Sequence, residues 1–77
     1  MPPRKVKGRV TNKIKELRLA HTSLTQAELG ARVGATRQTI IAIEAGKYAP
    51  SMELAFRIAR EFDVMFEEVF QFDPSGS

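Results

Sequence analysis

The segment "TRQTIIAIEAG", residues 36–46, places an arginine and a glutamine at the start of a short apolar run. The guanidinium of Arg37 can donate two parallel hydrogen bonds to guanine O6 and N7, and the amide of Gln38 can both donate to and accept from adenine. On a helix that turns by about 100° per residue, Ile40 and Ile43 share one side, and the two polar residues lie on the other. The spacing therefore predicts a helix anchored by isoleucine, with an outward face that suits the edges of bases.

Charge is divided unevenly along the 77-residue chain. Residues 1–47 hold ten Lys and Arg against three Asp and Glu, whereas residues 48–77 hold two against six, which gives a net charge of +3. A basic part joined to an acidic part indicates that one end of the molecule meets a polyanion. Charge alone leaves open the alternative of a solvated surface with uneven charges.

The composition argues against several other classes of function. The chain has no cysteine, so it has neither disulfides nor a thiolate metal site. The single histidine, His21, has no second histidine or placed carboxylate nearby in the sequence, and we expect no metal and no cofactor. There is no nucleophile and base pair and no phosphate-cradling glycine loop, so we expect no catalytic residues and no enzyme. No apolar run has the length of a signal peptide or membrane span, and we expect a cytoplasmic location and no membrane partner.

Capping residues and glycines divide the chain into predicted elements. Residues 1–10 should form a basic extended arm, residues 11–72 one folded domain and residues 73–77 a disordered tail. Thr11 or Asn12 is a possible N-cap for the first helix, since the apolar spacing of a helix begins just after them.

Five helices are expected within the domain, over residues 11–20, 25–34, 36–46 and 51–62 and around 66–70. Thr25 and Glu28 have the spacing of a capping box. Thr36 and Ser51 suit the N-caps of the helices that follow them. We expect the inward side chains to include Ile14, Leu17, Leu24, Ala27, Leu29 or Gly30, Val33, Ile40, Ile43, Leu54, Ala55, Ile58 and Phe62.

Strand content should be small. The segment "VFQF", residues 69–72, alternates like the start of a strand. Residues 5–10 are its expected partner, because an isolated edge strand would leave its backbone groups unpaired. The alternative is that this amino-terminal stretch swings toward DNA.

Two short helices joined by a tight turn, the second with exposed polar groups, form a helix-turn-helix unit, predicted here over about residues 25–44. The segments "LTQAEL", "TRQTI", "IEAGKYAPS" and "EEVF" resemble the Cro/lambda-repressor superfamily, most closely its small bacterial Xre-type transcriptional regulators. The resemblance covers roughly residues 12–72. It implies an all-α domain of five helices that binds double-stranded operator DNA, with the helix from Thr36 in the major groove.

The resemblance also implies roles for individual side chains. The positions expected to read bases are Arg37, Gln38, Thr39, Ile41 and Ala42. The positions expected to contact phosphates are Thr25, Gln26, Thr36, Lys47 and Tyr48, with Lys13 and Arg9 as further candidates. Gln26 fits this role because backbone N–H groups at a helix N-terminus attract anions. Each of these polar side chains has a plainer alternative, which is to be solvated or paired without touching DNA.

Ile41 and the pair formed by Arg18 and Glu44 have competing explanations. Ile41 either touches a thymine methyl group or packs at the edge of the preceding helix. Arg18 and Glu44 lie on the core-facing sides of their helices, and the resembling family pairs these positions across the domain. We therefore expect a structural ion pair rather than a DNA contact.

The aromatic residues near the end of the chain exceed what so small a core can hide. We expect a homodimer whose interface includes Phe66, Val69, Phe70 and Phe72. A symmetric dimer would place two reading helices about one DNA turn apart, ~34–36 Å, on a palindromic operator, and we expect a repressor. The alternative is a protein-interaction adapter or antitoxin that uses the same fold.

Two positions depart from the family pattern. Asp63 stands where such proteins usually have glycine or asparagine at the end of the fourth helix. Met65 stands where Ser or Thr would cap the fifth helix. We expect some strain at Asp63 and a missing side-chain cap at Met65.

Overall fold

The computed structural model describes residues 8–21 and 23–75, with the side chain of His21 outside the description. Residues 1–7 of the expected arm and residues 76–77 of the expected tail also lie outside it. In chain order the elements are β1 (Arg9–Asn12), α1 (Ile14–His21), α2 (Gln26–Val33), α3 (Arg37–Glu44), α4 (Met52–Phe62), α5 (Phe66–Val69) and β2 (Phe70–Asp73). The expected five-helix fold with a short pairing of its terminal segments is confirmed. None of the described helices has the length and apolar character needed to cross a membrane.

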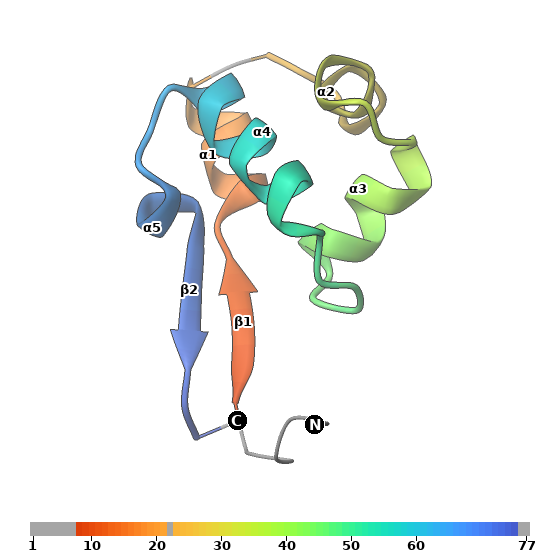
Figure 1. Cartoon of the computed structure of the whole chain (residues 1–77). Helices are drawn as coiled ribbons and strands as arrows, with labels where there is room; N and C mark the ends of the chain where they lie inside the picture. Colours follow the sequence, from red (N-terminus) through yellow and green to blue (C-terminus); the bar gives the residue numbers. More distant parts are fainter. Residues whose placement is uncertain (1–7, 22, 76–77) are drawn as a thin grey trace.

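The helix-turn-helix pair and the strands lie on different sides of α4 (Figure 1). We call the antiparallel pair of β1 and β2 the terminal ribbon; Val10 lies opposite Phe72 and Asn12 opposite Phe70. The first strand was expected over residues 5–10 but reaches Asn12, because α1 begins only at Ile14 and leaves the preceding residues extended. The second strand ends at Asp73, one residue into the segment expected as a tail.

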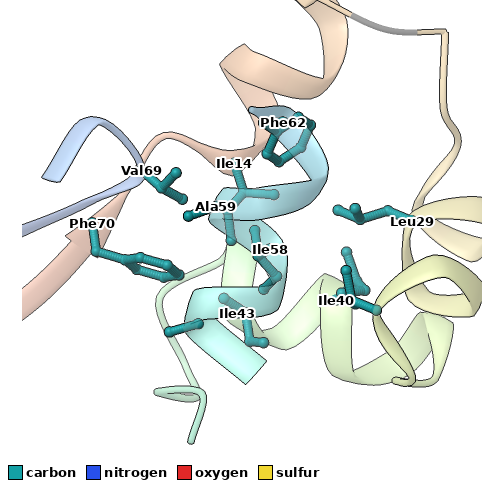
Figure 2. Close-up of a cluster of buried hydrophobic side chains, with 11 residues drawn as sticks. Ile14, Leu29, Ile40, Ile43, Ile58, Ala59, Phe62, Val69 and Phe70 are labelled. Carbon is teal, nitrogen blue, oxygen red and sulfur yellow. The ribbon is translucent and has the colours of Figure 1, made fainter. Parts of the chain in front are cut away.

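A single apolar core surrounds α4. Figure 2 shows Leu29 and Ile40 on one side of this helix and Val69 and Phe70 on the other. The core residues are Ile14, Leu29, Val33, Ile40, Ile43, Ala55, Ile58, Ala59, Phe62, Val69 and Phe70. Each fully buried isoleucine or leucine contributes about 1.5–3 kcal/mol by the apolar surface that it removes from water.

Most of the expected inward positions are confirmed, with one error. Ala27 is exposed, whereas Leu29, Gly30 and Val33 are buried. At 3.6 residues per turn, a residue two positions before Leu29 points to nearly the opposite side of α2. Leu17, Leu24 and Leu54 are partly buried and pack against the core.

The turn between α2 and α3 depends on two glycines. A Cβ at Gly30 would lie 2.6 Å from the carbonyl oxygen of Ala35, so only glycine lets the turn approach the helix this closely. Gly34 ends α2 in the left-handed conformation, with φ of 78°. These contacts fix the direction of α3 relative to α2. The residues expected to read bases lie on α3.

The predicted N-caps of α2, α3 and α4 are confirmed. The hydroxyls of Thr25, Thr36 and Ser51 accept hydrogen bonds from backbone N–H groups three residues later, at 3.1, 3.1 and 3.2 Å. Asp63 has a left-handed φ of 55°, and the side chain of Met65 makes no capping hydrogen bond. Both departures therefore have the local effects expected of them.

Candidate nucleic-acid interface

The outward face of α3 begins with its two strongest hydrogen-bonding side chains. Arg37 and Gln38 are exposed in the first turn of the helix, whereas Ile40 and Ile43 are completely buried beneath them. In helix-turn-helix proteins the N-terminal residues of the second helix meet the base edges. The core thus holds α3 with its polar end turned to solvent.

The other positions expected to face bases are less exposed. Thr39, Ile41 and Ala42 are all half-buried. The hydroxyl oxygens of Thr39 and Thr36 lie 2.9 Å apart and share a hydrogen bond. Because Ile41 is partly covered, both the thymine contact and the packing explanation remain compatible with its position.

The N-terminus of α2 contains a complete capping box. The backbone N–H of Thr25 donates to Glu28 Oε1 at 2.9 Å, and the Thr25 hydroxyl accepts from the Glu28 backbone N–H. The backbone hydrogen bond from Thr25 and then its side chain lower the pKa of Glu28. Desolvation raises this pKa by less, and the charge of Arg32 has the smallest effect and lowers it. The capping box therefore satisfies the backbone N–H groups of Thr25 and Glu28 at this end of α2.

Glu44 accepts hydrogen bonds from three donor atoms on two residues, Arg18 of α1 and Gln26 of α2. It accepts from Arg18 Nε at 3.0 Å and Nη2 at 3.4 Å and from Gln26 Nε2 at 3.1 Å. Arg18 also donates from Nη1 to the Leu24 carbonyl oxygen at 3.2 Å. The Arg18 and Glu44 side chains are only 12% and 6% exposed, as expected of a structural pair.

The hydrogen bond from Gln26 to Glu44 was not foreseen in the sequence. A glutamine Nε2 carries two hydrogens, so one can be held by Glu44 while the other meets a second acceptor. This arrangement fixes the direction of the Gln26 amide before any ligand arrives. The two residues lie 18 positions apart, and no local spacing rule would have joined them.

Three of the expected phosphate contacts gather near the carboxyl end of α3. Arg9, Lys47 and Tyr48 line the same hollow of about 260 Å³. The Arg9 guanidinium lies over Gly46, with Nη2 3.0 Å from where a Cβ would stand. Lys13 is exposed elsewhere, at the junction of β1 and α1, where its backbone N–H donates to the Val69 carbonyl oxygen at 2.8 Å.

A polar residue that sequence reasoning treated only as a cap also reaches α3. The Asn12 Nδ2 donates to the carbonyl oxygen of Ile43 at 2.8 Å. Its Oδ1 accepts from the backbone N–H of Ile14 at 3.2 Å, but Asn12 itself lies in β1, one residue further from α1 than an N-cap would be. The first contact spans 31 positions and left no local signal.

An apolar groove of about 560 Å³ lies beside the terminal ribbon. It is lined by Val10, Ala49, Pro50, Met52, Ala55, Phe66, Glu67, Phe70, Gln71 and Phe72. Phe72 is 62% exposed and Phe66 is half-buried, so both can offer surface to a partner.

Two residues expected at a dimer interface belong instead to the core. Val69 is fully enclosed, so its assignment to a surface is wrong. Phe70 is 6% exposed and can contribute only the inner wall of the groove. The apolar residues of this segment were expected to exceed what the core can hide, but Val69 and Phe70 lie against α4 within it (Figure 2). Val10 and Met52, which sequence reasoning did not select, are exposed at the same groove.

Within the described part of the chain, no three His, Cys, Asp or Glu side chains group as metal ligands would. A family model described as helix-turn-helix matches residues 14–69, which span α1 to α5 and leave out both strands of the ribbon. The chain belongs to the helix-turn-helix family. It is a small Xre-type member, as the sequence resemblance implied.

Several similar proteins carry names that agree with this membership. An uncharacterized HTH-type transcriptional regulator of Methanocaldococcus jannaschii is 52% identical over 62 residues, which cover 80% of this chain and 92% of that protein. A similarly named protein of Archaeoglobus fulgidus is 51% identical over 79% of this chain and 84% of its own. The regulator YgzD of Bacillus subtilis is 51% identical over 77% of this chain and 88% of its own. These relatives are named as regulators, and they do not single out a bacterial source.

Proposed function

We propose that this protein is a sequence-specific DNA-binding transcriptional regulator that inserts α3 into the major groove. One juxtaposition supports this most directly. Arg37 and Gln38 are exposed at the start of α3, and Gln26, at the start of the neighbouring α2, is held in place by Glu44. The regulator names of the relatives point to the same function.

In this proposal, α3 supplies the sequence preference. Arg37 donates a bidentate pair to a guanine, Gln38 pairs with an adenine, and each such contact discriminates by roughly 1–3 kcal/mol. The half-buried Thr39, Ile41 and Ala42 shape the surface beside them, with Ile41 against a thymine methyl group.

Phosphate contacts then fix the position of α3 on the duplex. At the N-termini of α2 and α3 these would come from Thr25, Gln26 and Thr36. At the other end of α3 they would come from Arg9, Lys47 and Tyr48, with Lys13 as an outlying contact. Each charge that neutralises a phosphate steepens the loss of affinity with salt, by a logarithmic slope of about 0.9 per contact.

A second copy of the chain is the partner that we propose for the apolar groove. Phe72, Met52 and Val10 are exposed around it, and their burial would favour a symmetric dimer. Two copies of α3 would then meet successive major grooves, about 34–36 Å apart, of a palindromic operator. We propose repression as the mode of regulation, following the resemblance to Cro and lambda repressor.

Sedimentation of two matched variants tests the dimer. Phe72→Ser should yield a folded monomer, because this side chain is 62% exposed and its loss leaves the core intact. Leu19→Ser, which changes an equally exposed apolar residue on α1, should leave the dimer unchanged. A monomeric wild-type protein at high concentration would contradict the proposal.

Selection from a random DNA pool tests sequence-specific binding. The wild type should enrich a palindromic motif, and a variant with Arg37→Ala and Gln38→Ala should lose it. Arg60→Ala is the matched control, because it also removes one positive charge, but from the exposed surface of α4. Weak binding without a motif in all three proteins would overturn the proposal and favour a protein-interaction adapter or antitoxin. A reporter placed behind the selected motif then tests repression.

A further inference from the structure

Asn12 joins the terminal ribbon to two helices through the two ends of one amide. Its Oδ1 accepts from the backbone N–H of Ile14 at the start of α1, and its Nδ2 donates to the Ile43 carbonyl oxygen near the end of α3. An amide can do this because it carries an acceptor and a donor on the same group. The Ile43 carbonyl oxygen also accepts from the backbone N–H of Gly46 at 3.0 Å, so the Asn12 amide adds a second hydrogen bond at this end of α3.

The strand that carries Asn12 is also part of the surface proposed to dimerise. Within the ribbon, Val10 faces Phe72 across the strand pair, and both line the apolar groove. Asn12 itself is opposite Phe70, which forms the inner wall of that groove. The four residues of β1 therefore include both Val10, which lines the groove, and Asn12, which is hydrogen-bonded to α3.

The contact between Asn12 and α3 lies beside two open hollows on the surface. Their volumes are about 260 and 140 Å³, and both are lined by Arg9, Val10, Asn12 and Gly46. The hydrogen bond from Asn12 to Ile43 is a direct link between β1 and α3 at this place.

We propose that Asn12 is a positioning residue that sets the separation of the two copies of α3 in the dimer, and hence the half-site spacing that the protein accepts. This inference rests on the proposed function. In a symmetric dimer the distance between the two reading helices depends on how the ribbons meet and on how each ribbon is fixed to its own α3. Asn12 supplies the second link without touching the bases.

Substitution of Asn12 can separate its two hydrogen bonds. Asn12→Asp keeps an oxygen for the Ile14 N–H but places a second oxygen against the Ile43 carbonyl oxygen. Asn12→Ala removes both contacts and serves as a second variant if the aspartate perturbs folding. Ser75→Ala is the matched control, because it removes a side-chain hydrogen bond just after β2, to Asp73 Oδ1 at 2.7 Å, and Ser75 does not line the groove.

The test measures affinities for the selected operator, for operators with one base pair added or removed between the half-sites, and for a single half-site. Circular dichroism establishes that each variant is folded at the temperature used. The wild type should prefer its own spacing, and both Asn12 variants should lose about three- to tenfold of that preference, which is the factor that one neutral hydrogen bond represents. Single half-site affinity should remain unchanged, and Ser75→Ala should behave as the wild type.

The contradictory results are distinct. An unchanged spacing preference in the folded Asn12 variants overturns the role of Asn12, and so does an equal loss of affinity for every operator and for the half-site. A wild type that selects no operator overturns the proposed function itself, and the role of Asn12 with it.

Discussion

At the start of α2 and of α3 a threonine hydroxyl caps the helix, whereas α5 begins at Met65, whose side chain caps nothing. The ends of the helices differ in the same way. Gly34 takes the left-handed position after α2, but Asp63, with its side chain, takes it after α4. The helix-turn-helix region is therefore locally satisfied, and the region of α5 carries both a missing cap and backbone strain.

The surfaces of the two regions differ as well. The helix-turn-helix region presents Arg37, Gln38 and a carboxylate-held Gln26, whereas the ribbon and α5 border an apolar groove. A surface that recognises polar base edges needs fixed donors before its ligand arrives. A region that forms a dimer interface can be stabilised further when the second copy binds to it. The surface proposed to read bases thus has capped helices and a fixed donor, whereas the region proposed to dimerise has an uncapped helix and a strained residue.

The largest effect should come from breaking the network around Glu44. Glu44→Ala leaves the Arg18 guanidinium, 12% exposed, without its carboxylate, and we expect a loss of about 3 kcal/mol in the free energy of unfolding. Glu61→Ala is the control, because it breaks the ion pair with Arg32, whose side chain is 58% exposed, and should cost no more than about 1 kcal/mol. Urea unfolding measures both, and equal losses would contradict the distinction between the two pairs.

The turn between α2 and α3 should tolerate no added methyl group. Helix propensity alone predicts that Gly30→Ala stabilises α2 by about 1 kcal/mol. The new Cβ would lie 2.6 Å from the Ala35 carbonyl oxygen, so we expect instead a loss of about 1–3 kcal/mol. Thermal unfolding decides by the sign of the change, and a rise in the midpoint would show that the turn is not close-packed.

Repair of the missing cap should make the two regions more alike. Met65→Thr adds a hydroxyl at the N-cap of α5, where Glu68 already accepts from the Met65 backbone N–H at 2.7 Å. The completed capping box should raise the free energy of unfolding by about 1 kcal/mol. The reverse change, Thr36→Ala at the cap of α3, should lower it by a similar amount, and a neutral result for both would remove capping as the difference between the regions.

The smallest effect should appear as a dependence on pH. Because its hydrogen bonds with Thr25 lower the pKa of Glu28 in the folded protein, the ionised group favours folding above the ordinary glutamate pKa of about 4.3. This stabilisation is lost as pH falls through the lowered value. Stability measured from neutral to acidic pH should therefore decline less in Glu28→Gln than in the wild type, and parallel curves would contradict this role of the capping box.

The features that sequence predicted are those set by neighbouring residues. The caps at Thr25, Thr36 and Ser51 and the apolar stripe of α4 follow from spacing within one helix. The ion pair of Arg18 with Glu44 came from the family resemblance, since no local rule joins residues so far apart.

The features that sequence missed depend on how distant segments meet. The register of the ribbon, the burial of Val69 and the hydrogen bonds of Asn12 and Gln26 are set only once α4, α3 and the strands are packed together. Hydrophobic alternation could not show which side of the segment 69–72 α4 would cover. The same limit applies to the groove, whose walls come from three separate parts of the chain, at residue 10, residues 49–55 and residues 66–72.

The proposed sequence-specific binding to DNA depends most on Arg37, which is expected to read a guanine from α3. The most direct measurement compares the selected operator with one in which that guanine is replaced by 7-deazaguanine, which lacks the N7 acceptor. The wild type should lose affinity equivalent to about 1–3 kcal/mol on this replacement, and Arg37→Ala, already without the donor, should lose almost nothing further. An equal loss in the two proteins, or no loss in the wild type, would contradict the claim that this side chain reads the base.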